Sequence, residues 1–293
     1  MVLESNLNIT KHRYNMLISI TWIIMQTTNT KEKTKTHYSI AISGASSGIG
    51  RALALAFANE ATLIYLAGRN KYRLEECRQA LLAKNKDLEI LYSAFDINDE
   101  KACKNWCNEI FKNRLDILIL NAGIATGMQD NADKHIEVSQ TNTLGVANLA
   151  FYALDYFKLQ TPFNTENTNT PRQTLVLMSS IASLAPLPNA PSYSASKYFV
   201  RILGESLSLS TNNINISVIC PGFIRTKLTE SISPYIPQMQ LEVAARKIYN
   251  AIKKGKRLYI FPFWLSMLAR IYALLPFKLQ RMLASLLNSM GHL

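Results

Sequence analysis

The chain has 293 residues, of which 48% are hydrophobic, and it carries a formal net charge of +12 at pH 7. A chain of this length can bury a substantial core within one large domain. The four cysteines include no Cys-x-x-Cys pair, and the four histidines have no metal-ligand or triad spacing. These spacings argue against a metal site and a disulfide framework and favour free thiols in the cytoplasm.

Residues 1–36 form a predicted N-terminal extension. A basic cluster, Lys11-His12-Arg13, precedes an apolar run over residues 16–25. That run is too short to span a bilayer comfortably and lacks an Ala-x-Ala cleavage site, so we predict neither a transmembrane helix nor a signal peptide. A disordered segment, a true translation start at Met16 or Met25, and an anchor remain as alternatives.

Short apolar runs then alternate with helical segments, which is typical of a parallel sheet covered on both faces. We predict early strands at residues 39–43, 63–67, 88–95 and 115–120, with helices at 51–59, 73–84 and 101–111 between them. Later strands are expected at 174–178, 214–219 and 258–261. The fold class is therefore a doubly wound, Rossmann-like α/β domain over residues 37–261, followed by a helical extension at 262–293.

A glycine-rich loop follows the first predicted strand, with the sequence Ser43-Gly44-Ala45-Ser46-Ser47-Gly48-Ile49-Gly50. Gly44 permits a tight turn, Gly48 lets the backbone approach a pyrophosphate, and Gly50 lets the next helix pack closely on the sheet. The N-terminus of that helix would offer free N–H groups to phosphates. A strand before the loop and a helix after it are the context that a dinucleotide site requires.

Tyr193 and Lys197 are four residues apart on a predicted helix, with Ser180 thirteen residues before the tyrosine. This spacing puts both side chains on one helix face, where the ammonium is expected to lower the pKa of the phenol. The phenol could then donate and accept protons, and Ser180 could hold a substrate oxygen. In isolation, each of these residues would have an ordinary structural role.

In combination, these motifs resemble the short-chain dehydrogenase/reductase family, in the branch with a Thr-Gly-x-x-x-Gly-x-Gly loop, over residues 38–261. Ser43 replaces the usual threonine and keeps a hydroxyl. Further matches are Asn121-Ala122-Gly123 after the fourth strand, Asn142 at the position of a catalytic asparagine, and the Pro-Gly-x-x-x-Thr element that ends at Thr226.

The resemblance implies that catalysis depends on four residues: Asn142, Ser180, Tyr193 and Lys197. It implies a nicotinamide cofactor held by Gly44, Ser46, Ser47, Gly48, Ile49, Gly50, Arg69, Asp96, Asn121, Ala122, Gly123, Tyr193, Lys197, Pro221, Gly222, Ile224 and Thr226. Asn142 would hold a water in a proton relay. No metal ligand is implied.

The end of the second strand is expected to decide between the two nicotinamide dinucleotides. Family members that prefer NAD(H) usually place an acid there, whereas this chain has Gly68 and then Arg69. A guanidinium binds phosphate strongly, so we predict a preference for the 2′-phosphate of NADP(H), with NAD(H) as the alternative. Arg69 could instead be an ordinary surface arginine.

The C-terminal tail is basic and apolar. No acid follows Glu242, while nine lysines and arginines do. Cations beside an apolar helical face fit an interfacial membrane segment, but the same face could cover the substrate cleft or pack on a second subunit of a homo-oligomer. No nucleic-acid-binding motif is visible, so we do not expect a nucleic-acid partner.

We therefore predict a cytoplasmic enzyme, at the membrane surface if the tail is interfacial, that interconverts a carbonyl and a secondary alcohol on a lipophilic small molecule. One alternative is a 3-oxoacyl-thioester reductase of lipid synthesis. Another, outside enzymes, is a regulator that senses NADPH without turnover. Substrate identity is not encoded in any motif that we find.

Overall fold

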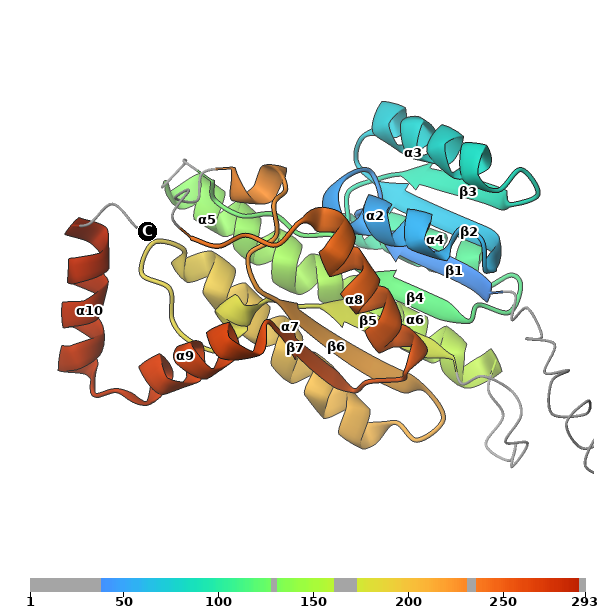
Figure 1. Cartoon of the computed structure of the whole chain (residues 1–293). Coiled ribbons are helices and arrows are strands. Elements are labelled where there is room, and N and C mark those ends of the chain that lie inside the picture. The colour runs from blue at the N-terminus through green and yellow to red at the C-terminus, as the bar shows by residue number, and fades with distance from the viewer. Residues whose placement is uncertain (1–37, 128–130, 161–172, 231–235, 290–293) are drawn as a thin grey trace, which may run out of the picture. The chain divides into compact units, whose positions relative to one another are not determined.

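The computed structural model describes residues 38–127, 131–160, 173–230 and 236–289. Within them, seven parallel strands form one sheet in the order β3-β2-β1-β4-β5-β6-β7 (Figure 1). The strands are β1 (Tyr38–Ser43), β2 (Ala61–Gly68), β3 (Glu89–Ala94), β4 (Ile117–Leu120), β5 (Thr174–Met178), β6 (Asn215–Pro221) and β7 (Leu258–Phe261). The order reverses between β1 and β4, and in sheets of this kind ligands bind at that reversal.

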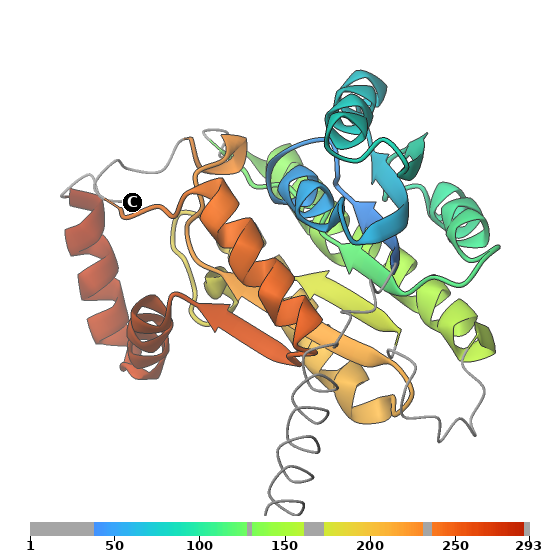
Figure 2. The same ribbon diagram turned by 45° about the vertical axis from the view of Figure 1, so that its right-hand side comes forward.

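Helices cover both faces of the sheet, as predicted (Figure 2). One face packs against α2 (Gly48–Phe57), α3 (Lys71–Lys84) and α8 (Leu241–Lys253). The other packs against α4 (Glu100–Ile110), α6 (Val146–Gln160) and α7 (Pro191–Ser210). Each face buries its own hydrophobic cluster, and this explains why strand residues of both orientations are apolar. The doubly wound α/β prediction is confirmed.

Predicted and observed boundaries differ where local polar chemistry intervenes. The fourth strand was expected from residue 115, but β4 begins at Ile117. Asp116, just before it, uses its carboxylate to accept hydrogen bonds from Ser39 N (3.0 Å) and Arg114 Nε (3.0 Å). The first helix was expected from residue 51, but α2 begins at Gly48, so the end of the glycine loop is already helical.

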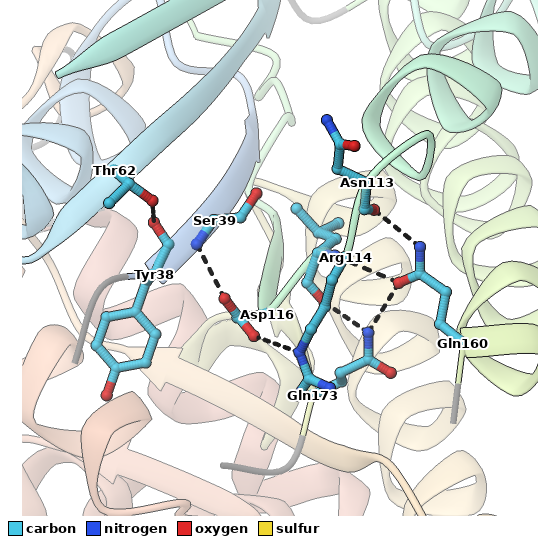
Figure 3. Close-up of polar contacts among 9 residues, drawn as sticks. Tyr38, Ser39, Thr62, Asn113, Arg114, Asp116, Gln160 and Gln173 are labelled. Carbon is cyan, nitrogen blue, oxygen red and sulfur yellow. Dashed lines mark hydrogen bonds and ion pairs between the residues drawn. The ribbon is translucent and has the colours of Figure 1, made fainter. Parts of the chain in front are cut away.

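A polar network ties elements together at the amino ends of the central strands (Figure 3). The buried Gln173 amide donates to Leu115 O (2.7 Å) and to Gln160 Oε1 (2.9 Å). Gln160, at the end of α6, donates in turn to the carbonyls of Phe111 (3.0 Å) and Asn113 (2.8 Å). These bonds satisfy buried polar groups at the edge of the sheet opposite to the glycine loop.

The helix that contains Tyr193 and Lys197 packs unusually closely on the sheet. Gly204 of α7 lies against β6, where a methyl group added to it would be 2.4 Å from Val218 Cγ2. Glycine permits this approach of the helix backbone to the strand. The contact therefore fixes the depth at which α7 carries its polar residues.

The segment before α6 is not regular α-helix. After α5 (Ala132–Ser139), residues Gln140–Gly145 form a π-helical turn, labelled η1, which leads directly into α6. Such turns frequently mark functional sites. The sequence pattern gave no indication of it, and the predicted site residue Asn142 lies within it.

The predicted helical tail is two helices, α9 (Phe263–Leu274) and α10 (Phe277–Ser289). α9 contacts β7 and the short helix η2 (Ile181–Ser183), and α10 follows beyond it (Figures 1 and 2). Large apolar side chains remain exposed on both helices, Leu274 by 85% and Phe277 by 75%. None of the helices in the described ranges has the length and hydropathy needed to cross a bilayer. The predicted N-terminal extension lies outside the described residues.

Candidate active site

A cleft of about 610 Å³ lies where the carboxyl ends of the strands meet. It is lined by almost every residue predicted to bind a cofactor or act in catalysis. These are Gly44, Ser46, Ser47, Gly48, Ile49, Arg69, Asp96, Asn121, Ala122, Gly123, Ser180, Tyr193, Lys197, Pro221, Gly222, Ile224 and Thr226. Two predicted residues, Gly50 and Asn142, lie behind the lining.

The glycine loop has the geometry that its sequence predicts. Gly44 and Gly48 have positive φ angles of 67° and 54°, a conformation that favours glycine. A methyl group on Gly50 would be 2.3 Å from the Gly44 carbonyl oxygen, so the loop can close on the helix only without a side chain there. Gly50 thus lets the helix start pack against the loop, while Ser46 and Ser47 line the cleft.

Hydrogen bonds between Ser43 and Asn121 join the glycine loop to the end of the neighbouring strand, β4. The Ser43 hydroxyl accepts hydrogen bonds from the backbone N of Asn121 (3.1 Å) and of Ala122 (3.2 Å). The Asn121 amide donates back to the carbonyls of Ser43 (3.3 Å) and Gly44 (3.1 Å). The Ser43 hydroxyl therefore binds the backbone after β4, and the Asn121 side chain stabilises the glycine loop.

Charged residues gather at the end of the cleft next to β2. Arg69 Nη1 lies 3.6 Å from Asp96 Oδ2, which follows β3, and 3.5 Å from Glu137 Oε1 on α5. The side chain of Arg69 is 55% exposed. Arg73, one helical turn further on, also lines the cleft. The cationic end predicted for NADP(H) is present, but it already pairs with two carboxylates.

Lys197 is buried at the opposite end of the cleft, with its Nζ donating to Met178 O at 3.1 Å. Burial lowers the pKa of its ammonium to about 8. Nζ lies 5.7 Å from the centre of the Tyr193 ring. The Tyr-x-x-x-Lys spacing therefore brings the two groups together as predicted.

Tyr193 and Ser180 both line the cleft. Burial raises the pKa of the Tyr193 phenol, and its hydrogen bond with Ser180 opposes that rise without cancelling it. This direction is opposite to the lowering by Lys197 that the sequence suggested, because the loss of solvent outweighs the other influences. Tyr193 is consequently protonated at neutral pH.

The two neighbouring serines are distinguished by their contacts. Both serines line the cleft. Ser180 has an extended backbone, and its Oγ accepts from Ala182 N at 3.2 Å. The Ser179 hydroxyl instead donates to the Lys197 carbonyl at 2.7 Å. Ser179 thus holds α7 against β5, which agrees with the preference for Ser180 as the substrate-facing serine.

Asn142 is fully buried in the π-helical turn. Its Oδ1 accepts from Ile124 N (2.8 Å), and its Nδ2 donates to Ile124 O (2.8 Å) and Ser196 Oγ (3.1 Å). The side chain thus joins the loop after β4 to α7. Both amide hydrogens are therefore in use, and its role in holding a water remains a prediction.

Besides Ser179, sequence reasoning missed five polar residues that line this cleft: Asn70, Arg73, Thr141, Lys227 and Thr229. Asn70 caps α3 by accepting from Arg73 N at 2.9 Å, a pattern that its position before the helix could have indicated. Arg73 lies in the first turn of α3, four residues after Arg69, and lines the same cleft. Lys227 follows Thr226 directly and had no motif of its own.

Comparison with known proteins decides the family. The model of the family described as short chain dehydrogenase matches residues 39–236. The chain belongs to the short-chain dehydrogenase family. It is an oxidoreductase that acts on CH–OH groups.

Among relatives, 15-hydroxyprostaglandin dehydrogenase [NAD(+)] of Macaca fascicularis is 30% identical over 198 residues, 65% of this chain and 70% of that protein. An uncharacterized oxidoreductase of Mycobacterium tuberculosis is 28% identical over 258 residues, 85% of this chain and 98% of the relative. Short-chain dehydrogenase/reductase family 16C member 6 of Bos taurus is 26% identical and covers 89% of this chain and 83% of its own.

Solved structures share the fold. A short-chain dehydrogenase from Sphingobium yanoikuyae in complex with NADPH has a TM-score of 0.67 at 22% identity, over 87% of this chain and 96% of that one. A family member from Burkholderia phymatum in complex with NAD has a TM-score of 0.66 at 19% identity, over 80% and 93% of the chains. At these identities, the likeness extends to the fold alone.

Proposed function

We propose that this dehydrogenase uses NADP(H) to interconvert a carbonyl and a secondary alcohol on a lipophilic molecule. The observation that supports this most directly is one continuous cleft with a glycine cradle at one end and Ser180, Tyr193 and Lys197 at the other. The residues fit a dinucleotide, because Gly44, Gly48 and Gly50 leave the space that phosphates and the adjoining helix need.

When bound, the nicotinamide exchanges a hydride with the substrate carbon. Ser180 and Tyr193 would hold the substrate oxygen by hydrogen bonds at the protein side of the cleft. Because the phenol of Tyr193 is protonated at neutral pH, it is prepared to donate its proton to an oxygen that gains charge. Lys197, with its ammonium 5.7 Å from the ring centre, stabilises negative charge on that phenol oxygen.

The choice of NADP(H) over NAD(H) rests on Arg69. A guanidinium at the end of β2, with Arg73 beside it on the cleft wall, favours a 2′-phosphate. NAD(H) remains the alternative, since one relative is named as an NAD(+) enzyme and the structural neighbours include both an NADPH and an NAD complex.

Two features support a lipophilic substrate. A relative is named for 15-hydroxyprostaglandin, a lipid. A second hollow, of about 950 Å³, lies between the loop after η2, α7 and the tail helices, with mainly apolar walls that include Leu184, Leu187 and Phe277. Ala182 and Ser194, which are close in sequence to Ser180 and Tyr193, also line it.

We further propose that the tail makes peripheral contact with a membrane surface. The exposed apolar side chains of α9 and α10 lie beside Arg270, Lys278 and Arg281, without any acid in either helix. An apolar face flanked by cations favours the interface of an anionic bilayer. The competing proposal is that these helices bind a second subunit.

Two alternative functions remain. A 3-oxoacyl-thioester reductase would use the same catalytic residues on acyl-carrier substrates. A regulator that senses NADPH without turnover is disfavoured, because Ser180, Tyr193 and Lys197 all lie in the cleft.

The decisive experiment is a turnover screen. Purified protein with NADPH is mixed with a panel of free ketones, steroids and 3-oxoacyl thioesters, and absorbance at about 340 nm is followed. Consumption with apolar ketones supports the proposed function, and consumption with thioesters alone supports the reductase of lipid synthesis. Tight NADPH binding with no turnover on the whole panel would favour the sensor.

A further inference from the structure

Arg69 lies between two carboxylates at the end of the cleft next to β2. Its Nη1 is 3.5 Å from Glu137 Oε1 and 3.6 Å from Asp96 Oδ2. Glu137 comes from α5, whereas Arg69 follows β2, so their ion pair joins two elements that are far apart in the sequence. A 2′-phosphate that used Arg69 would have to share it with both acids.

The carboxylates of Asp96 and Glu137 make different contacts. Asp96 Oδ1 accepts from Asn98 N at 2.9 Å, and the Asp96 carbonyl accepts from Asp99 N at 3.0 Å, so Asp96 shapes the turn before α4. Glu137 accepts from Lys134 Nζ at 2.7 Å and otherwise contacts Arg69. The bond from Lys134 holds the pKa of Glu137 below its usual value, so Glu137 is ionised at neutral pH.

The charge on Glu137 acts differently on the two dinucleotides. A 2′-phosphate carries up to two negative charges, so Glu137 repels it and competes with it for Arg69. The ribose hydroxyl that NAD(H) has instead is neutral and meets no such repulsion. Glu137 therefore reduces the advantage that Arg69 gives to NADP(H), without a matching penalty for NAD(H).

We infer that Glu137 is a specificity-determining residue that limits the preference for NADP(H) by competing with the 2′-phosphate for Arg69. This inference rests on the proposed function, in which Arg69 binds that phosphate. It assigns to α5, which no sequence motif connects with the nucleotide, a part in cofactor choice.

The test is Glu137→Gln, which keeps the side-chain shape and removes the charge. In low-salt buffer, NADPH and 2′,5′-ADP should bind about 3- to 10-fold more tightly to the variant than to the wild type, mainly because Arg69 no longer pairs with a carboxylate at position 137. NADH and 5′-AMP should change less than about 2-fold. The gain should shrink in about 0.5 M salt, since both side chains are partly exposed.

Glu75→Gln is the matched control. Glu75 lies on α3 and pairs with Arg78 at 3.1 Å, so this variant makes the same change in net charge without touching Arg69. It should leave all four affinities unchanged within about 2-fold. A gain equal to that of Glu137→Gln would assign the effect to net charge and overturn the inference.

A double variant isolates the contact. In the Arg69→Ala background, Glu137→Gln should tighten NADPH by less than half of its effect in the wild type, because no guanidinium is left to be released. The inference fails if Glu137→Gln leaves NADPH affinity unchanged, or weakens it, while Arg69→Ala still weakens NADPH selectively. If Arg69→Ala weakens NADPH and NADH equally, the proposed preference for NADP(H) itself fails, and the inference with it.

Discussion

At the scale of single residues, the site holds a lysine where burial opposes its charge. The Lys197 side chain is buried, and burial lowers the pKa of its ammonium from 10.5 to about 8. That difference corresponds to a cost of about 3 kcal/mol to the folded state below pH 8. The cost declines as the pH rises from about 8 to 10.5, where the folded protein has lost the proton that the unfolded chain still binds.

Lys197→Met should therefore separate stability from activity. At pH 7 the variant should be about 1 to 2 kcal/mol more stable than the wild type, because removing the charge outweighs loss of the bond to Met178 O. The stability gain should vanish near pH 10.5, and turnover should be lost throughout. Urea unfolding of both proteins at pH 7 and 10.5, without nucleotide, measures this. A less stable variant at pH 7 would contradict the account.

Tyr193→Phe tests the proton donor. Removing the phenol oxygen should reduce turnover by about 10²- to 10⁴-fold while nucleotide affinity stays within a few-fold, since the cradle lies elsewhere in the cleft. The matched control is Tyr72→Phe on α3, where the tyrosine is 85% exposed and lines neither hollow. Steady-state rates beside NADPH titration give both readouts. Turnover close to that of the wild type in Tyr193→Phe would exclude this tyrosine as the acid.

Residue-level chemistry was predictable where it depends on identity and spacing. The spacing of Tyr193 and Lys197 within one helix, and the glycines of one loop, required no knowledge of distant contacts. The direction of the Tyr193 pKa was not predictable, because it depends on how much solvent the surrounding elements exclude. The Arg69–Glu137 pair was also missed, since 68 positions separate the two residues and no local pattern joins them.

At the scale of secondary-structure elements, strands buried on both faces could be predicted from their apolar runs. β5 and β7 begin and end as expected, because turn residues or polar residues flank them. The π-helical turn could not be predicted, and neither could the bonds that its buried Asn142 makes with Ile124 and Ser196, which form only in the folded chain. Local propensity does not carry that information.

The contact between α7 and β6 gives a prediction at this scale. Gly204→Ala should gain up to about 1 kcal/mol in helix propensity. However, the new methyl group would be 2.4 Å from Cγ2 of the fully buried Val218, and overpacking typically costs about 1 to 3 kcal/mol. We expect a net loss of about 1 to 2 kcal/mol in unfolding free energy, with lower turnover because α7 carries Tyr193 and Lys197.

The partner residue supplies the control. In a Val218→Ala background, space for the new methyl group exists, so Gly204→Ala should be neutral or stabilising there. Urea unfolding of the wild type, both single variants and the double variant measures the coupling. Additive effects would mean that the close approach of helix and strand is not what the glycine provides.

At the scale of the whole molecule, the chain combines a catalytic cleft with a cationic, apolar tail. The sequence composition indicated that tail, but it did not predict which elements its helices contact. In the structure, α9 contacts β7 and η2, and a methyl group on Gly222 would be 2.9 Å from Pro262 Cδ. Truncation at the end of β7 would therefore disturb the wall of the nucleotide cleft, so a test of the tail should spare α9.

Membrane contact is best tested by charge substitution and a shorter truncation. The wild type should cosediment with anionic vesicles better than with neutral ones, and added salt should reduce the difference. Substituting Arg270, Lys278 and Arg281 together by Gln should remove most of the anionic preference, at about 1 kcal/mol for each cation. Truncation after Leu275 should weaken binding to both vesicle types, because it removes the exposed apolar side chains of α10.

The matched control for that substitution replaces three exposed lysines outside the tail, Lys86, Lys101 and Lys104, by Gln. It makes the same change in net charge, so vesicle binding that responds only to the tail variant would assign the contact to α9 and α10.

Size-exclusion chromatography and thermal melting of the truncated protein address the competing proposal. If α10 instead binds a second subunit, truncation should halve the apparent mass or lower the melting temperature, and the wild type should ignore both vesicle types. That result would exclude the membrane proposal.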